Sequence, residues 1–488
     1  MFGHVKDDAV AGVVVFLVAL PLCLGIAIAC GVPPVSGLVA GIVGGLVIPW
    51  ISRSSLSVSG PAAGLTSVVL AEVSQLGGIG PFLTAVVIAG GFQCLLGVLR
   101  TGRFAAIVPS SVIKGMLAAI GITIIWKQVP VLFGVTGGLG DIASQKHLGA
   151  ILIGGLSLAI LLTWPSTPMA RYRTISPALI VVVLASVLAM VFAGSPLSLQ
   201  PEHYVDVPLG GVVALYSALP KPDLAAFSIP ATWIAGVTIA IVASIETLLS
   251  LQAVDRLDPL KRHSPPDREL LAQGLANSIS GALGGLPLTA VIVRSSANVA
   301  AGAKERFAAL VHGALLLVAV VLAGPLINRI PLACLAAVLI QVGLNLCKPA
   351  MFRMQVKLGL TQLLPFAVTI AAVLALDLLK GVIVGIVVGI LFVLYENSQR
   401  AVVTERDVDG VLRIRFRRDG TFVSKPSIVS TLDDVDDGEH LVIDGTGEYI
   451  DHDVKEVLAT FIEDARHRRI NVTVVGIDMA HATPGAGH

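Results

Sequence analysis

The sequence predicts an all-α polytopic membrane protein that ends in a small α/β domain. Of its 488 residues, 55% are hydrophobic and only 13% are charged, about half the charged share of soluble domains. Apolar stretches long enough, or nearly so, to cross a bilayer as helices recur from Val10 to about Tyr395. The mean hydropathy is +0.88. A membrane β-barrel would show short alternating segments instead, so a helical membrane protein is expected.

The membrane domain is expected to cover residues 1–400, with seven apolar segments, a polar loop from Ser195 to Pro230, and seven more segments. The segments lie near residues 9–30, 36–51, 57–74, 81–98, 105–126, 148–164, 177–193, 231–252, 270–286, 288–302, 307–323, 331–346, 361–378 and 380–396. In the loops, sixteen lysines and arginines fall on the side of the N-terminus and five on the other side. This bias predicts cytoplasmic N- and C-termini and a multi-pass protein of the cell (inner) membrane. The first apolar stretch is read as a span and not as a signal peptide.

Residues 401–480 have the composition of a soluble α/β domain on the cytoplasmic side. The segments "VLRIRF", "HLVID" and "INVTVVGI" predict strands, and "DHDVKEVLATFIEDARHRR" has the apolar spacing of a helix. The glycine-containing tail, residues 481–488, is predicted to be disordered.

Composition and motifs exclude several classes of function. The net charge is +1 and the chain has no basic tract, so nucleic acid is not an expected partner. No nucleophile elbow, zinc-protease motif or phosphate-binding loop occurs, which argues against an enzyme, ATP hydrolysis and a cofactor. The five cysteines are predicted to be reduced packing residues: Cys23, Cys30, Cys94, Cys334 and Cys347.

Two segments are poor helices at comparable positions of the two halves: "SVSGPAAGLTSVVLAEV" in the third and "GGLPLTAVIVRSSANVAAGA" around the tenth. Such paired interruptions are typical of inverted-repeat transporters, which bind substrate near the midplane between two half-helix N-termini. Pro61 is expected in the first turn of its half-helix, where free N–H groups and the helix dipole attract an anion. Alternatively, "SGPAAG" is only a packing kink. Gly37, Gly41 and Gly45 are expected to form such a packing face.

Two ionisable residues lie inside apolar segments, Arg294 in the tenth and Glu246 in the eighth. At that depth charges are costly and normally face a cavity, a partner or an ion pathway. Arg294 would make the centre anion-selective, and Glu246 could take up H⁺ or Na⁺ and couple its movement to that of the anion. The alternative is a structural ion pair between them. Apart from a possible Na⁺ site near Glu246, no metal is expected, and His312 is predicted to be a packed, hydrogen-bonded residue.

The membrane part resembles the sulfate permease (SulP) family, the prokaryotic relatives of the animal anion exchangers. The most specific match is "ELLAQGLANSISGALGGLPLTAVIVRSSANVAAGAKERFAALVHG". "VALPLCLGIAIACGVPPVSGL" resembles the family's first span, and "VPSSVIKGMLAAIGITIIWKQVPVLFG" resembles its fifth.

This resemblance implies a seven-plus-seven inverted repeat in which a core domain binds the anion and a gate domain supports elevator-like movement. Glu246 matches the family's acidic position in the eighth segment. The family's binding residues carry over to the first, third and tenth segments, at Leu22, Cys23, Ser59, Gly60, Pro61, Ala62, Ala63, Thr289, Ile292, Val293, Arg294 and Ser295.

The chain departs from the family pattern in two places. Leu22 and Cys23 stand where many members carry a polar pair, which favours a small anion held by backbone N–H groups. The C-terminal domain resembles a STAS domain, but Asp451-His452-Asp453-Val454 replaces the usual Asp-Ser-Ser/Thr-Gly. Without a hydroxyl there, control by phosphorylation is not expected. We expect the domain to serve in partner docking or dimer contact, and the protein to be a homodimer.

The leading hypothesis is a secondary active transporter of an inorganic anion, sulfate or bicarbonate, in symport with H⁺ or Na⁺. An uncoupled anion channel or a chloride/bicarbonate exchanger is the main alternative. A dicarboxylate or nucleobase permease is a weaker one, because nucleobase carriers would favour acidic and amide side chains over Arg294.

Overall fold

The computed structural model describes residues 3–102, 109–135, 139–168, 176–207, 216–376, 378–399, 402–407 and 410–479. The chain forms two compact units, Met1–Met354 with Thr369–Ile383 and Gln355–Val368 with Val384–His488. The tail expected to be disordered lies outside the described residues, as do residues 105–108 at the start of the fifth predicted segment.

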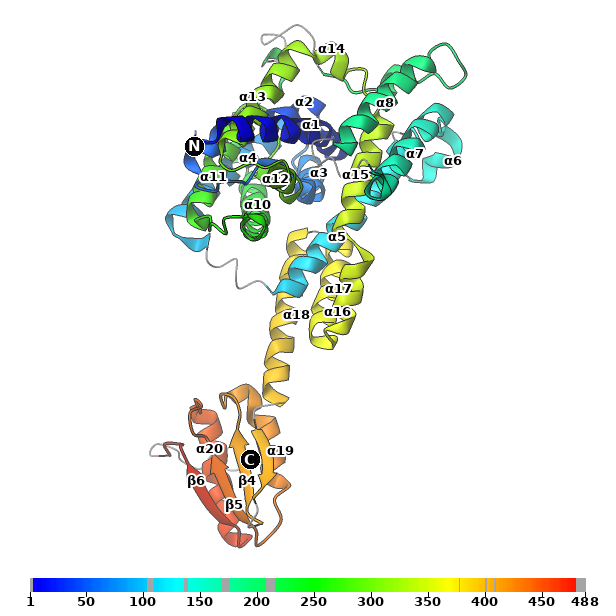
Figure 1. Ribbon diagram of the computed structural model, residues 1–488. Helices are drawn as coiled ribbons and strands as arrows, with labels where there is room; N and C mark the ends of the chain where they lie inside the picture. Colours follow the sequence, from blue (N-terminus) through cyan, green and yellow to red (C-terminus); the bar gives the residue numbers. More distant parts are fainter. Residues whose placement is uncertain are drawn as a thin grey trace. The chain divides into compact units, whose positions relative to one another are not determined.

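Each of the fourteen predicted apolar segments overlaps one helix (Figure 1). These helices are α1 (Val5–Ala29), α2 (Pro34–Ile51), α3 (Thr66–Gln75), α4 (Ile79–Val98), α5 (Ser110–Leu132), α7 (Leu148–Thr163), α8 (Pro177–Val191), α10 (Pro230–Leu257), α11 (Pro266–Ala282), α12 (Ile292–Ala300), α13 (Phe307–Leu322), α15 (Leu332–Leu346), α17 (Leu360–Ala375) and α18 (Leu378–Gln399). The connections contain short helices: α6 (Ile142–Gln145), α14 (Gly324–Ile327) and α16 (Pro349–Lys357). In the described part of the chain, seven helices are long and apolar enough to cross a membrane.

Two of the fourteen helices, α3 and α12, are far too short to cross a bilayer. Helix α3 has 10 residues and α12 has 9, about half of what a span needs. Each follows a three-residue strand, β1 (Ser59–Pro61) or β2 (Leu288–Ala290). The strands pair antiparallel and place Gly60 opposite Thr289, which joins the interrupted segments of the two halves.

The prediction for Pro61 is wrong in one respect. Pro61 is the last residue of β1, and α3 begins only at Thr66, after the 3₁₀ turn Ala63–Leu65. Proline is tolerated in this strand because β1 is paired on one side only, with β2, and an edge position does not require its missing N–H.

The helices of the first unit pack in two groups. The first helix group contains α1, α2, α3, α4, α10, α11, α12 and α13, in which α4 packs against α11 and α10, and α13 against α1 and α2. The second helix group contains α5, α7, α8 and α15, with α5 and α7 both against α15. The predicted packing role of the glycines on α2 is confirmed, because a Cβ on Gly45 would lie 2.6 Å from Cα of Gly313. All five cysteines are free.

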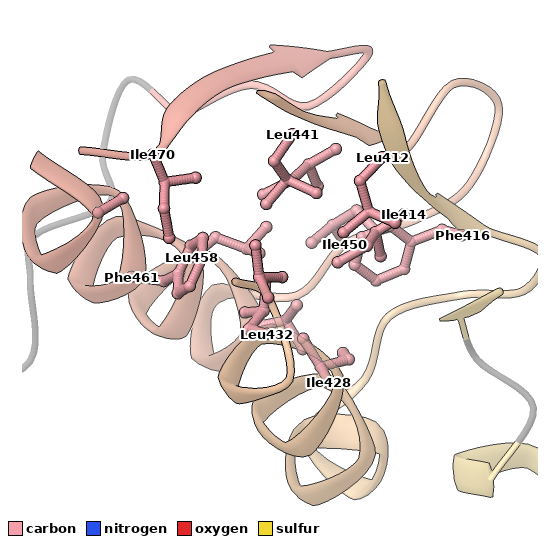
Figure 2. Packing of buried hydrophobic residues seen from close by; sticks show 14 residues of the cluster. Leu412, Ile414, Phe416, Ile428, Leu432, Leu441, Ile450, Leu458, Phe461 and Ile470 are labelled. Carbon is pink, nitrogen blue, oxygen red and sulfur yellow. The ribbon is translucent and has the colours of Figure 1, made fainter. Parts of the chain in front are cut away.

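The second unit contains a four-stranded sheet in the order β3-β4-β5-β6, formed by β3 (Val402–Arg406), β4 (Leu412–Phe416), β5 (His440–Asp444) and β6 (Asn471–Val475). Strands β3 and β4 are antiparallel, and the other two pairs are parallel. Figure 2 shows apolar side chains of the strands facing those of α19 (Lys425–Asp433) and α20 (His452–His467). The alternation in "VLRIRF" is confirmed, since Leu412, Ile414 and Phe416 are buried. This small α/β unit fits the expected STAS-like domain.

Candidate functional site

The starts of α3 and α12 are brought together by the β1–β2 pair. Leu65 and Val291 precede these helices, and neither provides a side-chain cap. Ala62, before the 3₁₀ turn that leads into α3, provides none either. The first N–H groups of a helix have no partner within the helix. At the positive ends of two helix dipoles, N–H groups that no N-cap side chain accepts can bind an anion.

A cavity of about 80 Å³ lies at these two helix starts. Six of the predicted site residues line it, namely Leu22, Ala63, Glu246, Ile292, Val293 and Arg294. The other lining residues are Ile26, Gly64, Leu249, Ser250 and Val291 of the first helix group and Met116, Leu117, Ile120, Val342 and Leu346 of the second. The cavity therefore has one wall from each helix group.

Arg294 is fully buried. Its Nη2 donates a hydrogen bond to the carbonyl oxygen of Pro61 at 3.3 Å, whereas Nε and Nη1 have no hydrogen-bond partner. A buried guanidinium with unmet donors is costly unless a negative group approaches it. The residue therefore adds a positive charge, and unused donors, to the cavity wall.

Glu246 of α10 extends its carboxylate to the other helix start. The Gly64 N–H donates to this carboxylate, and a Cβ on Gly64 would lie 2.5 Å from Oε1, so only glycine allows this approach. The second oxygen, Oε2, is buried and has no hydrogen-bond partner. No ion pair joins Glu246 to Arg294, so the structural pair considered from the sequence is not formed in this structure. Among the described lining residues, Glu246 is the only acid.

Seven predicted site residues lie behind the cavity wall and not on it: Cys23, Ser59, Gly60, Pro61, Ala62, Thr289 and Ser295. The Ser59 hydroxyl accepts a hydrogen bond from Gln273, and the Ser295 hydroxyl accepts one from the N–H of Val58 at 3.0 Å. Cys23 packs against α2, where a Cβ on Gly41 would lie 2.7 Å from its sulfur. These three side chains contact neighbouring elements and support the cavity wall without lining the cavity.

His312 departs from its prediction in part. The residue is packed and fully buried, as expected, but neither ring nitrogen has a hydrogen-bond partner. It does not line the cavity.

Sequence reasoning missed Ser250 and the wall from α5 and α15. Ser250 lies one helical turn after Glu246 on α10, and that spacing was a usable signal. The residues of α5 and α15 that line the cavity are all apolar and carry no comparable signal.

Two broken helices that meet at a cavity within the membrane domain are the arrangement of a membrane transport protein. The chain belongs to the Sulfate permease family, whose profile matches residues 5–369. The family consists of transporters and not of enzymes.

Known relatives agree with this assignment. The chain is 26% identical to "Putative sulfate transporter YvdB" of Bacillus subtilis (strain 168), over 84% of this chain and 77% of the relative. It is also 26% identical to "Bicarbonate transporter BicA" of Picosynechococcus sp., over 71% of this chain and 62% of the relative.

Two solved structures share the fold. The transmembrane domain of a cyanobacterial bicarbonate transporter BicA matches with a TM-score of 0.68 at 23% identity, over 78% of this chain and 98% of that one. SLC26A9 matches with a TM-score of 0.78 at 17% identity, over 97% of this chain and 84% of that one.

Proposed function

We propose that the protein is a secondary active transporter of a small inorganic anion, sulfate or bicarbonate, in symport with H⁺ or Na⁺ bound at Glu246. It would act in the cell membrane with both termini in the cytoplasm. One observation carries the proposal: the unpartnered Oε2 of Glu246 belongs to the same cavity as the uncapped start of α12.

The cavity offers positive charge to an anion. The first turn of α12 and Arg294 both contribute to its lining, and Arg294 has unused donors. Much of the remaining lining is apolar, so an anion would depend on backbone N–H groups and one guanidinium. The relatives named as sulfate and bicarbonate transporters support these two anions as the first to be tested.

Electrostatics explains why Glu246 would couple the two ions. Two like charges about 4 Å apart repel by about 4 kcal/mol at an effective dielectric constant of about 20, nearly a thousandfold in affinity. An ionised Glu246 would therefore oppose the anion, whereas a protonated or Na⁺-bound Glu246 would not. Each ion would favour binding of the other, which is the requirement for symport.

The two walls of the cavity suggest how it opens. The helix starts and Glu246 belong to the first helix group, whereas Met116, Ile120 and Leu346 belong to the second. We expect the first helix group to carry the anion past the second, which is the elevator-like movement of a core domain against a gate domain.

The α/β unit would serve in dimer contact or partner docking within a homodimer. Asp451 caps α20 by accepting a hydrogen bond from Val454 N–H at 2.9 Å. Asp451 keeps the aspartate of the usual motif and has a structural role as the cap of α20. The next residue, His452, stands at the position of the motif's hydroxyl and cannot be phosphorylated as a serine would be.

Flux into proteoliposomes tests the transport proposal. An inward H⁺ or Na⁺ gradient should accelerate uptake of labelled sulfate or bicarbonate, and Glu246→Gln should abolish that acceleration. Glu463→Gln, which changes an exposed carboxylate on α20, is the matched control and should behave like the unaltered protein. A flux that changes neither with the two gradients nor with the Glu246 substitution would refute coupling.

The alternatives give different results in the same vesicles. A channel would produce a large anion conductance, and an exchanger would require a counter-anion inside. Competition by chloride, dicarboxylates and uracil against the labelled anion separates the remaining substrate classes.

A further inference from the structure

Helix α11 carries a row of buried polar side chains that reaches both short strands. Glu269, Gln273, Asn277 and Ser280 are spaced by four, four and three residues, so they lie on one face of the helix. Each is at most 1% exposed. We call these four residues the α11 polar row.

Asn277 binds β2 as a neighbouring strand would. Its Oδ1 accepts a hydrogen bond from the N–H of Leu288 at 2.7 Å, and its Nδ2 donates to the carbonyl oxygen of Leu288 at 3.0 Å. Both backbone polar groups of one strand residue are therefore satisfied by one side-chain amide. The same Nδ2 donates to Oε1 of Gln93 on α4 at 2.6 Å, which restrains the amide.

Gln273 binds β1 from the preceding turn of the same helix. Its Nε2 donates to the Ser59 hydroxyl at 2.7 Å and to Oε1 of Glu269 at 2.8 Å. The Ser52 hydroxyl donates to the other oxygen of Glu269. One turn of α-helix rises about 5.4 Å, close to the ~4.8 Å between neighbouring strands, so one helix face can hold two paired strands.

We propose that Gln273 and Asn277 are positioning residues of the anion site: by holding β1 and β2 to one helix, they set the starts of α3 and α12 against each other. None of the described residues lining the cavity comes from α11, so this action is indirect. The proposal rests on the proposed anion transport. The two short strands have three residues each, too few to fix this geometry alone.

An exchange of donor and acceptor tests the role of Gln273. Gln273→Glu removes the donor to Glu269 and places two carboxylates side by side, and the Ser59 hydroxyl must then donate and no longer accept. The double variant Glu269→Gln/Gln273→Glu restores both hydrogen bonds of residue 273 with the polarity reversed, because the new Gln donates to the new Glu and the Ser59 hydroxyl donates as well. The Ser52 hydroxyl still donates to residue 269, now to its amide oxygen. Ser278→Ala is the matched control, since Ser278 bonds to the carbonyl oxygen of Val87 on α4.

Two quantities are measured on the full-length protein: KM for sulfate and bicarbonate in proteoliposomes, and the anion-dependent rise in unfolding temperature in detergent. We expect Gln273→Glu and Asn277→Leu to raise KM at least tenfold and to abolish the anion-dependent rise. The double variant should return KM to within threefold of the value for the unaltered protein. Ser278→Ala alone should also keep KM within that range.

Unchanged KM in folded Gln273→Glu and Asn277→Leu variants would overturn the positioning role, as would a loss of maximal rate with KM unaltered. If Gln273→Glu does not fold, a double variant that folds with weakened anion binding would overturn it too. Absence of anion flux in the unaltered protein would instead refute the proposed function.

Discussion

Gly60 of β1 lies directly against the guanidinium of Arg294, because a Cβ at Gly60 would be 1.9 Å from Nη1. Arg294 also donates to the carbonyl oxygen of Pro61, the next residue along the same strand. The position of the buried charge therefore depends on the absence of a side chain at Gly60. This contact links the broken segments of the two halves more closely than strand pairing alone.

Gly60→Ala is expected to displace Arg294 from its place in the cavity wall. Anion flux should fall at least tenfold, equivalent to about 1.4 kcal/mol. Overpacking should also lower the free energy of unfolding, by about 1–3 kcal/mol. Flux in proteoliposomes and thermal unfolding in detergent measure the two effects. Gly91→Ala is the control, since a Cβ at Gly91 of α4 would meet nothing within 4 Å; equal flux in both variants would contradict the prediction.

Ala63→Leu is expected to block the site without unfolding the protein. Ala63 lines a cavity of about 80 Å³, and three additional carbon atoms would occupy much of the space required by an anion. Ala62, by contrast, is 2% exposed and lies behind the wall, so Ala62→Leu should chiefly destabilise the fold.

Labelled-anion uptake and unfolding temperature distinguish these two results. Ala231→Leu, at an exposed position of α10, should change neither. Normal uptake by a folded Ala63→Leu variant would mean that "SGPAAG" serves only in packing.

The sequence singled out these residues as a candidate site because their composition conflicts with a membrane span. Small residues and proline from Ser59 to Ala63, together with Arg294 and Glu246, cannot be explained as lipid-facing helix. The sequence did not distinguish strand from helix at Pro61, since proline fits both a first helical turn and an edge strand. Only the pairing partner from the other half, far away in the sequence, decides between them.

The second wall of the cavity could not be predicted from the sequence. Met116, Ile120 and Leu346 line the cavity, but apolar residues of this kind are equally typical of helix packing and of lipid-facing surfaces. Gln273 and Asn277 were visible within a family motif, but their role depends on which strands they contact. In the α/β unit, the alternation of apolar and polar residues was sufficient to predict strand β4, whereas β3 and α19 were not predicted from the sequence.

Asp451→Ala should weaken the start of α20. The Asp451 carboxylate accepts a hydrogen bond from Val454 N–H, and loss of such a cap costs about 1 kcal/mol. Hydrogen exchange of the α20 amides in the full-length protein should be faster by roughly fivefold. Asp453→Ala is the control because Asp453 lies in the same first turn but does not cap the helix. Equal acceleration in both variants would point to a general effect of charge.

Leu22→Gln is expected to change which anion the site prefers. Leu22 lines the cavity beside the start of α12, and its side chain cannot replace the hydrogen bonds that an anion loses with its water. A hydrogen bond to a charged group contributes about 1.5–3 kcal/mol. Because sulfate carries more charge and binds water more strongly than bicarbonate, the added amide should lower the KM for sulfate relative to that for bicarbonate by about tenfold. Leu22→Met keeps an apolar side chain of similar size and should leave the ratio of the two KM values unchanged; an equal ratio in both variants would show that Leu22 does not determine selectivity.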